Sequence, residues 1–293
     1  MTIYEQIKEI NDADIIYAVV SLKGGVSKTT TSSSIAYYLA HRMKKKVALL
    51  DMDTTNPTLP KVMGLQGRKL RFTDRGLIAP IKYSKNLLVM SVDFFLPSYD
   101  QPILLKEIQK KRLLIQMLKS VEYGKCDYIV FDTPPTTSPE LMTILKTFPA
   151  KKLRIIILSQ PGGASSNSAI KTIQHLKATG IPINGIITSM DGYTCKGCGL
   201  YDPIFPNPVS IEKIAKKYQI PYLGGIQLGS VKRTKKGAWI LQSPSFDSVM
   251  ENILKTKPVK FKPLRKKLSL FQKIKIARAI DKNLTRKIRG DVK

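Results

Sequence analysis

The stretch SLKGGVSKTTT (residues 21–31) lies between an apolar run and a helix-length segment, and it predicts both the fold and the chemistry. A common phosphate-binding loop has a glycine, four free residues and then Gly-Lys-Ser/Thr, so that backbone N–H groups surround the phosphates. Here Leu22 and Ser27 occupy the two outer glycine positions, and Gly24 and Gly25 lie between them. The stretch therefore predicts a nucleotide site built on an unusual loop.

The polar residues of this loop have the types that bind a nucleotide and its magnesium ion. Lys28 is expected to reach the β- and γ-phosphates, and the Thr29 hydroxyl is expected to bind Mg²⁺. Thr29 also opens a predicted helix, whose N-terminal dipole favours the same anion. Lys23 is an additional cation that the common loop lacks. The residues expected to contact the nucleotide within the loop are Gly24, Gly25, Val26, Ser27, Lys28, Thr29 and Thr30.

Apolar runs rich in β-branched residues alternate with helix-length segments along the chain. Continuous apolar runs are typical of strands that are buried on both faces of a parallel sheet. The expected strands are residues 15–20, 47–50, 87–90, 128–131, 155–158, 183–188 and 222–226. The expected helices are residues 29–43, 101–122, 138–147, 165–179 and 211–218. This order predicts an α/β, doubly wound fold with a mostly parallel sheet, helices on both faces, and ligands at the carboxyl ends of the strands.

Carboxylates follow two of the expected strands. Asp51 and Asp53 close the stretch LLDMD, and the two-residue repeat of a strand predicts that they point the same way. Asp132 closes the stretch YIVFD, as in a Walker B motif. We expect Asp132 to serve magnesium, and of Asp51 and Asp53 we expect one to serve the outer shell of magnesium and the other to orient an attacking water.

Charge is the unusual feature of the composition. The 293 residues include 49 Lys and Arg against 21 Asp and Glu, a net charge of +28. Such a field favours polyanions, with nucleic acid first and an anionic membrane surface second, although a lysine-rich solvated surface is the alternative. With no run of ~18 apolar residues and no signal-peptide pattern at the N-terminus, the sequence predicts a cytoplasmic protein.

The positive charge is concentrated at the C-terminus. Residues 255–293 contain 15 Lys and Arg but only two Asp, which predicts a P-loop domain over residues 1–254 and a basic helical extension over residues 255–293. Apolar residues recur every three or four positions from 264 onward, as on one face of a helix. That helix can dock on the domain with its lysines toward nucleic acid, or lie on an anionic membrane.

The segment KGGVSKTT resembles the loop of the deviant-Walker ATPases, the family that includes ParA, MinD and Mrp. The resemblance spans about residues 15–250 and implies that ATP binding closes a homodimer around two ATP molecules, which are then slowly hydrolysed. It implies that Lys23 reaches the phosphates bound by the partner protomer, much like an arginine finger. It also implies that Asp53 positions the hydrolytic water and that Asp132 holds the magnesium shell.

Three positions depart from the family pattern. If the second loop glycine needs a positive φ, Ser27 carries strain on the order of 1–3 kcal/mol. Ser189 stands where Mrp-like proteins have an asparagine for adenine recognition, which puts base selectivity in question. Residues 136–138 read TTS in place of a glycine-rich switch, which puts γ-phosphate sensing in question.

The segment TCKGCG places Cys195 and Cys198 in a Cys-x2-Cys pair, within a stretch that is similar to Mrp proteins. Two thiolates are half of the four ligands that a closed zinc or iron–sulfur site requires. By resemblance, two protomers complete the set and share a [4Fe-4S] cluster or Zn²⁺. A tight turn with free thiols, or adventitious zinc, is the alternative.

Two roles follow from these features. The charge favours a ParA-like switch whose ATP-bound dimer binds DNA non-specifically, in partition or organisation of the chromosome, and the protein is then nucleoid-associated. The cysteine pair favours an Mrp-like iron–sulfur carrier. A MinD-like membrane switch is a weaker alternative, and no sequence feature identifies an adaptor.

Overall fold

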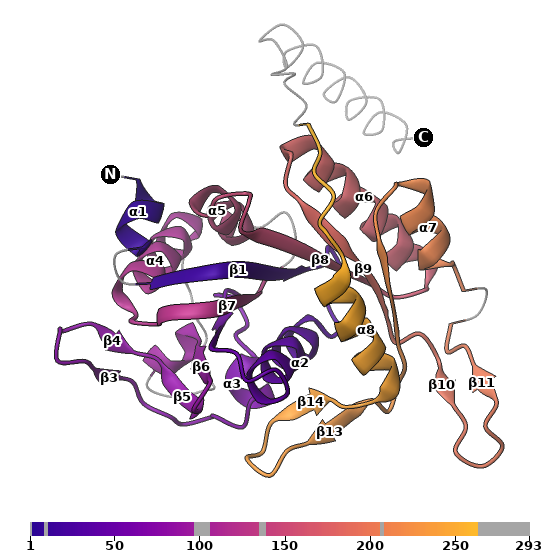
Figure 1. The fold of residues 1–293 in the computed structure, drawn as a ribbon, viewed down its shortest axis with the longest axis horizontal. Helices are drawn as coiled ribbons and strands as arrows, with labels where there is room; N and C mark the ends of the chain where they lie inside the picture. Colours follow the sequence, from indigo (N-terminus) through magenta and orange to yellow (C-terminus); the bar gives the residue numbers. More distant parts are fainter. Residues whose placement is uncertain (1, 9–10, 97–105, 135–138, 206–207, 263–293) are drawn as a thin grey trace, which may run out of the picture. The chain divides into compact units, whose positions relative to one another are not determined.

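A sheet of eight strands forms the centre of the protein in the computed structural model, which describes residues 2–8, 11–96, 106–134, 139–205 and 208–262 (Figure 1). The strand order is β12-β9-β8-β1-β7-β2-β6-β5, and only the β5–β6 pair is antiparallel. The bounds are β1 (Asn11–Val20), β2 (Val47–Asp51), β5 (Ile81–Ser84), β6 (Leu87–Met90), β7 (Gly124–Asp132), β8 (Leu153–Ser159), β9 (Ile183–Ser189) and β12 (Tyr222–Ile226). This sheet confirms the predicted fold class, and each of the seven predicted strands corresponds to one of its strands.

The centre of the sheet is fully buried because helices cover both of its faces. Val19 of β1 and Phe131 of β7 are both 0% exposed. Parallel pairing aligns the carboxyl ends of neighbouring strands, so that Val19 pairs with Asp132 and Asp132 pairs with Asp51. The register therefore brings the predicted Walker B carboxylate beside the carboxylate that ends β2.

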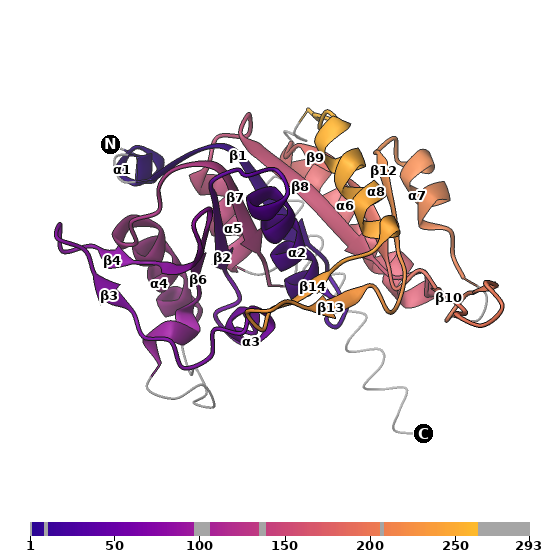
Figure 2. The same ribbon diagram turned by 60° about the horizontal axis from the view of Figure 1, so that its bottom comes forward.

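The helices lie in two layers. Helices α2 and α8 cover one face of the sheet, and α4, α5, α6 and α7 cover the other (Figures 1 and 2). After β1 the chain crosses toward the β5 end of the sheet, and after β7 it crosses toward the β12 end. Because crossover connections between parallel strands are right-handed, crossings in opposite directions place their helices on opposite faces. The bounds are α1 (Ile3–Lys8), α2 (Lys28–His41), α3 (Leu59–Val62), α4 (Glu107–Ser120), α5 (Pro139–Thr147), α6 (Gly163–Thr179), α7 (Ile211–Lys217) and α8 (Pro244–Lys255).

Two helix predictions fall partly outside the described residues, and three helices, α1, α3 and α8, were not predicted. The part of the predicted helix 101–122 before residue 106 and the start of the predicted helix 138–147 are not described. Helix α8 was not predicted. Its N-cap Ser243 accepts a hydrogen bond from Phe246 N at 3.2 Å, and its apolar face is buried.

Three short hairpins extend from the sheet. They are β3 (Arg71–Phe72) with β4 (Ile78–Ala79), β10 (Tyr193–Thr194) with β11 (Tyr201–Asp202), and β13 (Val231–Arg233) with β14 (Trp239–Leu241). The third is fixed to α2, because Leu241 N donates to Ser34 Oγ at 2.7 Å.

The contacts divide the chain into residues 1–262 and 263–293. Val259 still forms a bridge with Ile183 at the start of β9, whereas the predicted tail helix lies outside the described residues. The domain boundary at residues 254 and 255 stays a prediction. Within the part of the chain that the structure describes, no helix is both long and apolar enough to cross a bilayer.

Candidate functional site

Five parallel strands end at the same edge of the sheet, and polar residues follow each of them. The loop of residues 21–27 follows β1, Asp51 ends β2, Asp132 ends β7, Gln160 follows β8 and Ser189 ends β9. All four of these side chains are at least nine-tenths buried. The predicted nucleotide residues from distant parts of the sequence thus form one site, at the edge where a doubly wound fold binds its ligand.

The loop before α2 has two residues with positive φ. Gly25 has φ 73°, and Ser27, the residue before α2, has φ 59° and ψ 34°. The loop turns at Gly25 with open space around it, whereas Ser27 is a residue with a Cβ in the left-handed region. Within the described residues, no group accepts a hydrogen bond from the backbone N–H groups of residues 24–30. These N–H groups are free to bind phosphate oxygens.

The Ser27 side chain is tied into the site by two hydrogen bonds. Its hydroxyl donates to Val26 O at 2.7 Å, and its Oγ lies 2.7 Å from Ser189 Oγ. Because the single Ser27 proton points to Val26, Ser189 is the donor of the second bond. These bonds offset part of the strain that a non-glycine residue has at this φ. The two departures from the family pattern are therefore in contact with each other.

The two lysines of the loop make different contacts. Lys28 Nζ lies 3.4 Å from Lys23 O, and burial lowers the pKa of Lys28 while Asp132 and Asp53 act to raise it. Lys23 Nζ lies 3.5 Å from Gln160 Oε1. Lys28 thus lies among the carboxylates of its own protomer, whereas Lys23 lies on the side of the loop toward Gln160.

Gln160 connects the loop to the ends of β8 and β9. Its Oε1 lies near Lys23, as described above. Its Nε2 donates hydrogen bonds to Gly25 O at 3.4 Å and to Met190 Sδ at 3.0 Å. This residue was not predicted from the sequence. Its position could have indicated it, because Gln160 directly follows a buried strand and the other strands that end at this edge are also followed or closed by polar residues.

Asp51 has both carboxylate oxygens in hydrogen bonds. Oδ1 accepts from Asp53 N at 3.1 Å, and Oδ2 accepts from Leu59 N at 3.3 Å and from Ser91 Oγ at 3.0 Å. Its side chain is 0% exposed, and burial together with Asp132 raises its pKa well above the ordinary value. Asp51 thereby fixes the turn after β2 and the start of α3.

Asp53 lies in that turn and not in the strand. Because β2 ends at Asp51, the strand alternation that predicted a common direction for the two carboxylates does not apply to Asp53. Asp53 Oδ1 accepts from Thr55 N at 3.0 Å and Asn56 N at 3.1 Å. These bonds hold one oxygen and leave its carboxylate partly exposed beside Lys28.

Asp132 has the features of a cation ligand. Its side chain is 2% exposed, burial raises its pKa to about 6, and its Oδ1 has no hydrogen-bond partner among the described residues. A buried oxygen without a partner is costly unless a cation or a water meets it. Thr29 Oγ1, 3.1 Å from Thr58 Oγ1, belongs to the same cluster and interacts with Asp132. These hard oxygen atoms fit Mg²⁺.

The cysteine pair lies on the exposed β10–β11 hairpin. Cys195 N donates to Leu200 O and Gly199 N donates to Cys195 O, both at 2.9 Å, which closes the turn. Backbone N–H groups of Cys198 and Gly197 also hydrogen-bond the Cys195 sulfur and lower the pKa of its thiol. The turn thus presents a partly exposed and an exposed thiol side by side.

The same hairpin does not contain a complete metal site. Across the described ranges, no three His, Cys, Asp or Glu side chains form a group that could hold a metal ion. Leu200 is 71% exposed, and the neighbouring Tyr193 and Tyr201 are 44% and 50% exposed. Apolar surface of this kind around two thiols is suited to contact with another protein.

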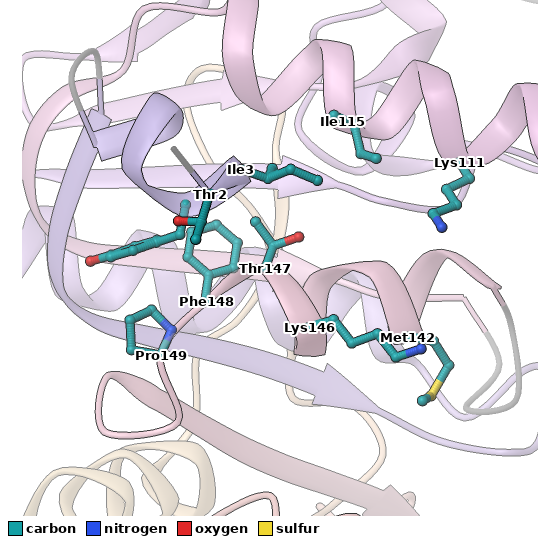
Figure 3. A pocket seen from close by; sticks show the side chains of 10 residues that line it. Thr2, Ile3, Lys111, Ile115, Met142, Lys146, Thr147, Phe148 and Pro149 are labelled. Atoms are coloured by element: carbon teal, nitrogen blue, oxygen red, sulfur yellow. The ribbon is translucent and has the colours of Figure 1, made fainter.

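A hollow of about 660 Å³ lies at the opposite edge of the sheet, between α1, α4 and α5 (Figure 3). Ile3, Ile115, Met142 and Phe148 make its walls mainly apolar. The described residues that line it have no carboxylate, imidazole or thiol. It is therefore separate from the nucleotide site in both position and chemistry.

A model of the family described as ParA: NUBPL iron-transfer P-loop NTPase matches residues 12–256. The chain belongs to this family. Because it has the family's phosphate loop at the edge of a P-loop fold, the protein is an NTPase that binds and hydrolyses nucleotide, of the ParA, MinD and Mrp type.

Solved structures have the same fold as this NTPase. A nucleotide-binding protein from Archaeoglobus fulgidus in complex with ADP is 25% identical, with a TM-score of 0.62 over 86% of this chain and 92% of that chain. The septum site-determining protein MinD from Pyrococcus horikoshii, complexed with Mg-ADP, is 17% identical, with a TM-score of 0.53 over 82% and 86%. A putative plasmid partition protein from Borrelia burgdorferi bound to AMPPNP is 22% identical, with a TM-score of 0.52 over 83% and 97%.

Proposed function

We propose that this NTPase is an ATP-switched carrier of an iron–sulfur cluster, which two protomers hold between their cysteine pairs. The observation that carries this proposal is the β10–β11 hairpin, where Cys195 and Cys198 are both accessible and backbone N–H groups lower the pKa of the Cys195 thiol. The description of the family as iron-transfer NTPases supports the same cargo.

A second copy of the chain supplies the ligands that one chain lacks. A cluster needs four thiolates, and one hairpin provides two. The exposed Leu200, Tyr193 and Tyr201 give that second copy an apolar surface to contact. The structural relatives include a MinC:MinD cell-division complex, in which a protein of this fold binds a partner.

The nucleotide site controls the dimer in this proposal. Lys28 and the loop N–H groups bind the phosphates, and Asp53 orients the attacking water. Thr29 and Asp132 would hold Mg²⁺, with Asp51 fixing the turn beside them, and a bound ion would supply positive charge next to the phosphates. Lys23 acts on the nucleotide of the partner protomer. Lys23→Gln should therefore bind ATP but fail to dimerise with a slowly hydrolysed analogue, as light scattering would measure.

The cargo is tested by anaerobic reconstitution followed by iron and sulfide analysis. We expect about half a [4Fe-4S] cluster per protomer, because four thiolates serve one cluster. Cys198→Ser should abolish incorporation, whereas the control Cys126→Ala should retain it because Cys126 is buried in the core. Equal iron content in wild type and Cys198→Ser would contradict the proposal.

A DNA-binding switch is the second candidate, and the net charge of +28 favours it. A protein of this kind should bind duplex DNA in a manner that depends on ATP and falls steeply with salt. Binding measured at several salt concentrations, with and without ATP, tests this role. Duplex binding that is weak and indifferent to ATP would remove it.

A further inference from the structure

Thr58 lies where the turn after β2 enters α3, and its hydroxyl does not cap that helix. An N-cap threonine usually accepts a hydrogen bond from the second or third backbone N–H of its helix. Here the second helical residue is Pro60, which has no N–H, and the N–H of Leu59 donates to Asp51. Asp51 thus caps the start of α3, and the Thr58 hydroxyl is available for another contact.

The Thr58 hydroxyl reaches the start of α2 instead. Its Oγ1 lies 3.1 Å from Oγ1 of Thr29, the expected magnesium ligand, where α3 packs beside α2 (Figures 1 and 2). The backbone of Thr58 is held on both sides. Its carbonyl accepts from Val62 N at 3.1 Å, and the N–H that follows it is the one bound by Asp51. The position of Thr58 relative to Thr29 is therefore set by backbone contacts of the fold.

The Thr29 hydroxyl differs from a neighbouring hydroxyl of α2. Hydroxyl side chains within a helix commonly bond to a backbone carbonyl one turn earlier. Ser32 does so, with Oγ donating to Lys28 O at 3.0 Å. The Thr29 hydroxyl instead contacts Thr58 and interacts with Asp132. Thr58 therefore gives the Thr29 hydroxyl a partner within the site.

The two hydroxyls can serve a metal ion and a carboxylate at the same time. A hydroxyl has one proton to donate and two lone pairs to accept. When Thr29 directs its proton to Asp132 and one lone pair to a cation, the second lone pair is left for the proton of Thr58. All the bonding positions of Thr29 Oγ1 are then used, and its orientation as a ligand is fixed. Groups that orient a metal ligand in this way typically change metal affinity by about 10- to 100-fold.

We propose that Thr58 is a positioning residue of the magnesium site, and that its hydroxyl holds Thr29 Oγ1 in the orientation that binds the ion. The inference rests on the magnesium site of the proposed function and does not involve the cysteine hairpin. Thr58 and Asp53 both belong to the segment between β2 and α3. The contact with Thr29 therefore also joins the segment of the water-orienting carboxylate to the start of α2.

ADP binding tests this role without turnover. Titration calorimetry with ADP is carried out in chelator and at increasing Mg²⁺ concentrations. By linkage, the gain in ADP affinity gives the affinity of the ADP complex for Mg²⁺. Thr58→Val replaces the hydroxyl by a methyl group of similar size. We expect its magnesium affinity to fall about tenfold, while its ADP affinity in chelator stays that of wild type.

Two further variants separate the hydroxyl from the shape of the turn. Thr58→Ser keeps the hydroxyl and should retain most of the magnesium affinity. The matched control Thr55→Val lies in the same turn, but the Thr55 hydroxyl accepts from Lys110 Nζ at 2.9 Å, so magnesium affinity should not change. ATP hydrolysis gives a second readout. Excess Mg²⁺ should restore turnover in Thr58→Val, which it would not do if the substitution only damaged the fold.

Three outcomes would overturn the proposal. The first is a magnesium affinity in Thr58→Val equal to that of wild type. The second is an equal loss of ADP affinity with and without Mg²⁺, which would show that Thr58 only supports the shape of the phosphate loop. The third is the same loss of magnesium affinity in Thr55→Val. If Mg²⁺ gave no gain in wild type, the magnesium site of the proposed function would fail as well.

Discussion

The phosphate loop and the cysteine hairpin differ in how much of a working site one chain supplies. The loop lies at the edge where five strands end, and buried groups from each of them surround it. The hairpin is local and exposed, and it offers two thiols where a cluster needs four ligands. The difference teaches that one fold assembles the groups that bind nucleotide, whereas the proposed cluster would need a second protomer for half of its ligands. Variants in each region should therefore separate the two activities.

The largest effect is expected for Lys28→Ala. The variant removes the ammonium that lies among the loop carbonyls and carboxylates, so ATP affinity should fall by at least about 100-fold. Isothermal titration with ATP and Mg²⁺ measures this, with Lys46→Ala as a matched control outside the loop. An unchanged affinity in Lys28→Ala would show that the loop does not bind phosphate in this way.

The next effect should be confined to the hairpin. Cys195→Ser removes one ligand from each half of the shared cluster, so bound iron should fall to background while ATP hydrolysis continues. Iron analysis and phosphate release on the same preparation measure both. Parallel loss of ATPase activity would mean that the two regions are not separable.

Asp132→Asn probes the buried acid of the nucleotide site. Because burial raises the pKa of Asp132 to about 6, ionisation destabilises the metal-free fold as pH rises through that value. Wild type should therefore be less stable than Asp132→Asn by about 2–3 kcal/mol at pH 8, and the difference should vanish below pH 4.

Chemical denaturation in the presence of a chelator measures that difference. With Mg²⁺ and ATP the order should reverse, because only the carboxylate binds the ion and stabilises the wild type. If the difference in stability between wild type and Asp132→Asn did not change with pH, the pKa of Asp132 would not be raised.

The smallest effect concerns Ser27 and Ser189. In wild type, Ser189→Ala removes the 2.7 Å hydrogen bond to Ser27 and should cost about 1 kcal/mol of stability. In a Ser27→Gly background the same change should cost almost nothing, and Ser27→Gly itself should change ATP affinity little, since relief of left-handed strain offsets the lost bonds. Additive effects in a double-mutant cycle would show that the two serines act independently.

Sequence patterns predicted the parts of the fold that repeat. Continuous apolar runs gave the seven parallel strands, and the order of polar residues at their ends predicted that Lys28, Asp51 and Asp132 come together. The β13–β14 hairpin was not predicted, because its strands have three residues each and its position depends on Leu241 binding Ser34.

The details of the site depended on tertiary contacts. Gln160 was missed because an amide after a strand has no motif of its own, and its contacts with Lys23 and Gly25 come from 137 and 135 residues away. The turn that holds Asp53 was also missed, since the end of β2 is set by hydrogen bonds to Asp51. The left-handed Ser27 was foreseen only as a consequence of replacing a glycine.

Native mass spectrometry of the anaerobically reconstituted protein tests the central claim, that one chain supplies the groups that bind nucleotide whereas the proposed metal site needs the cysteines of two chains. The account predicts a species of two chains with one [4Fe-4S] cluster, which falls apart into cluster-free monomers in Cys198→Ser. A single chain with a stable metal centre, or a dimer that retains its full iron without Cys198, would contradict it.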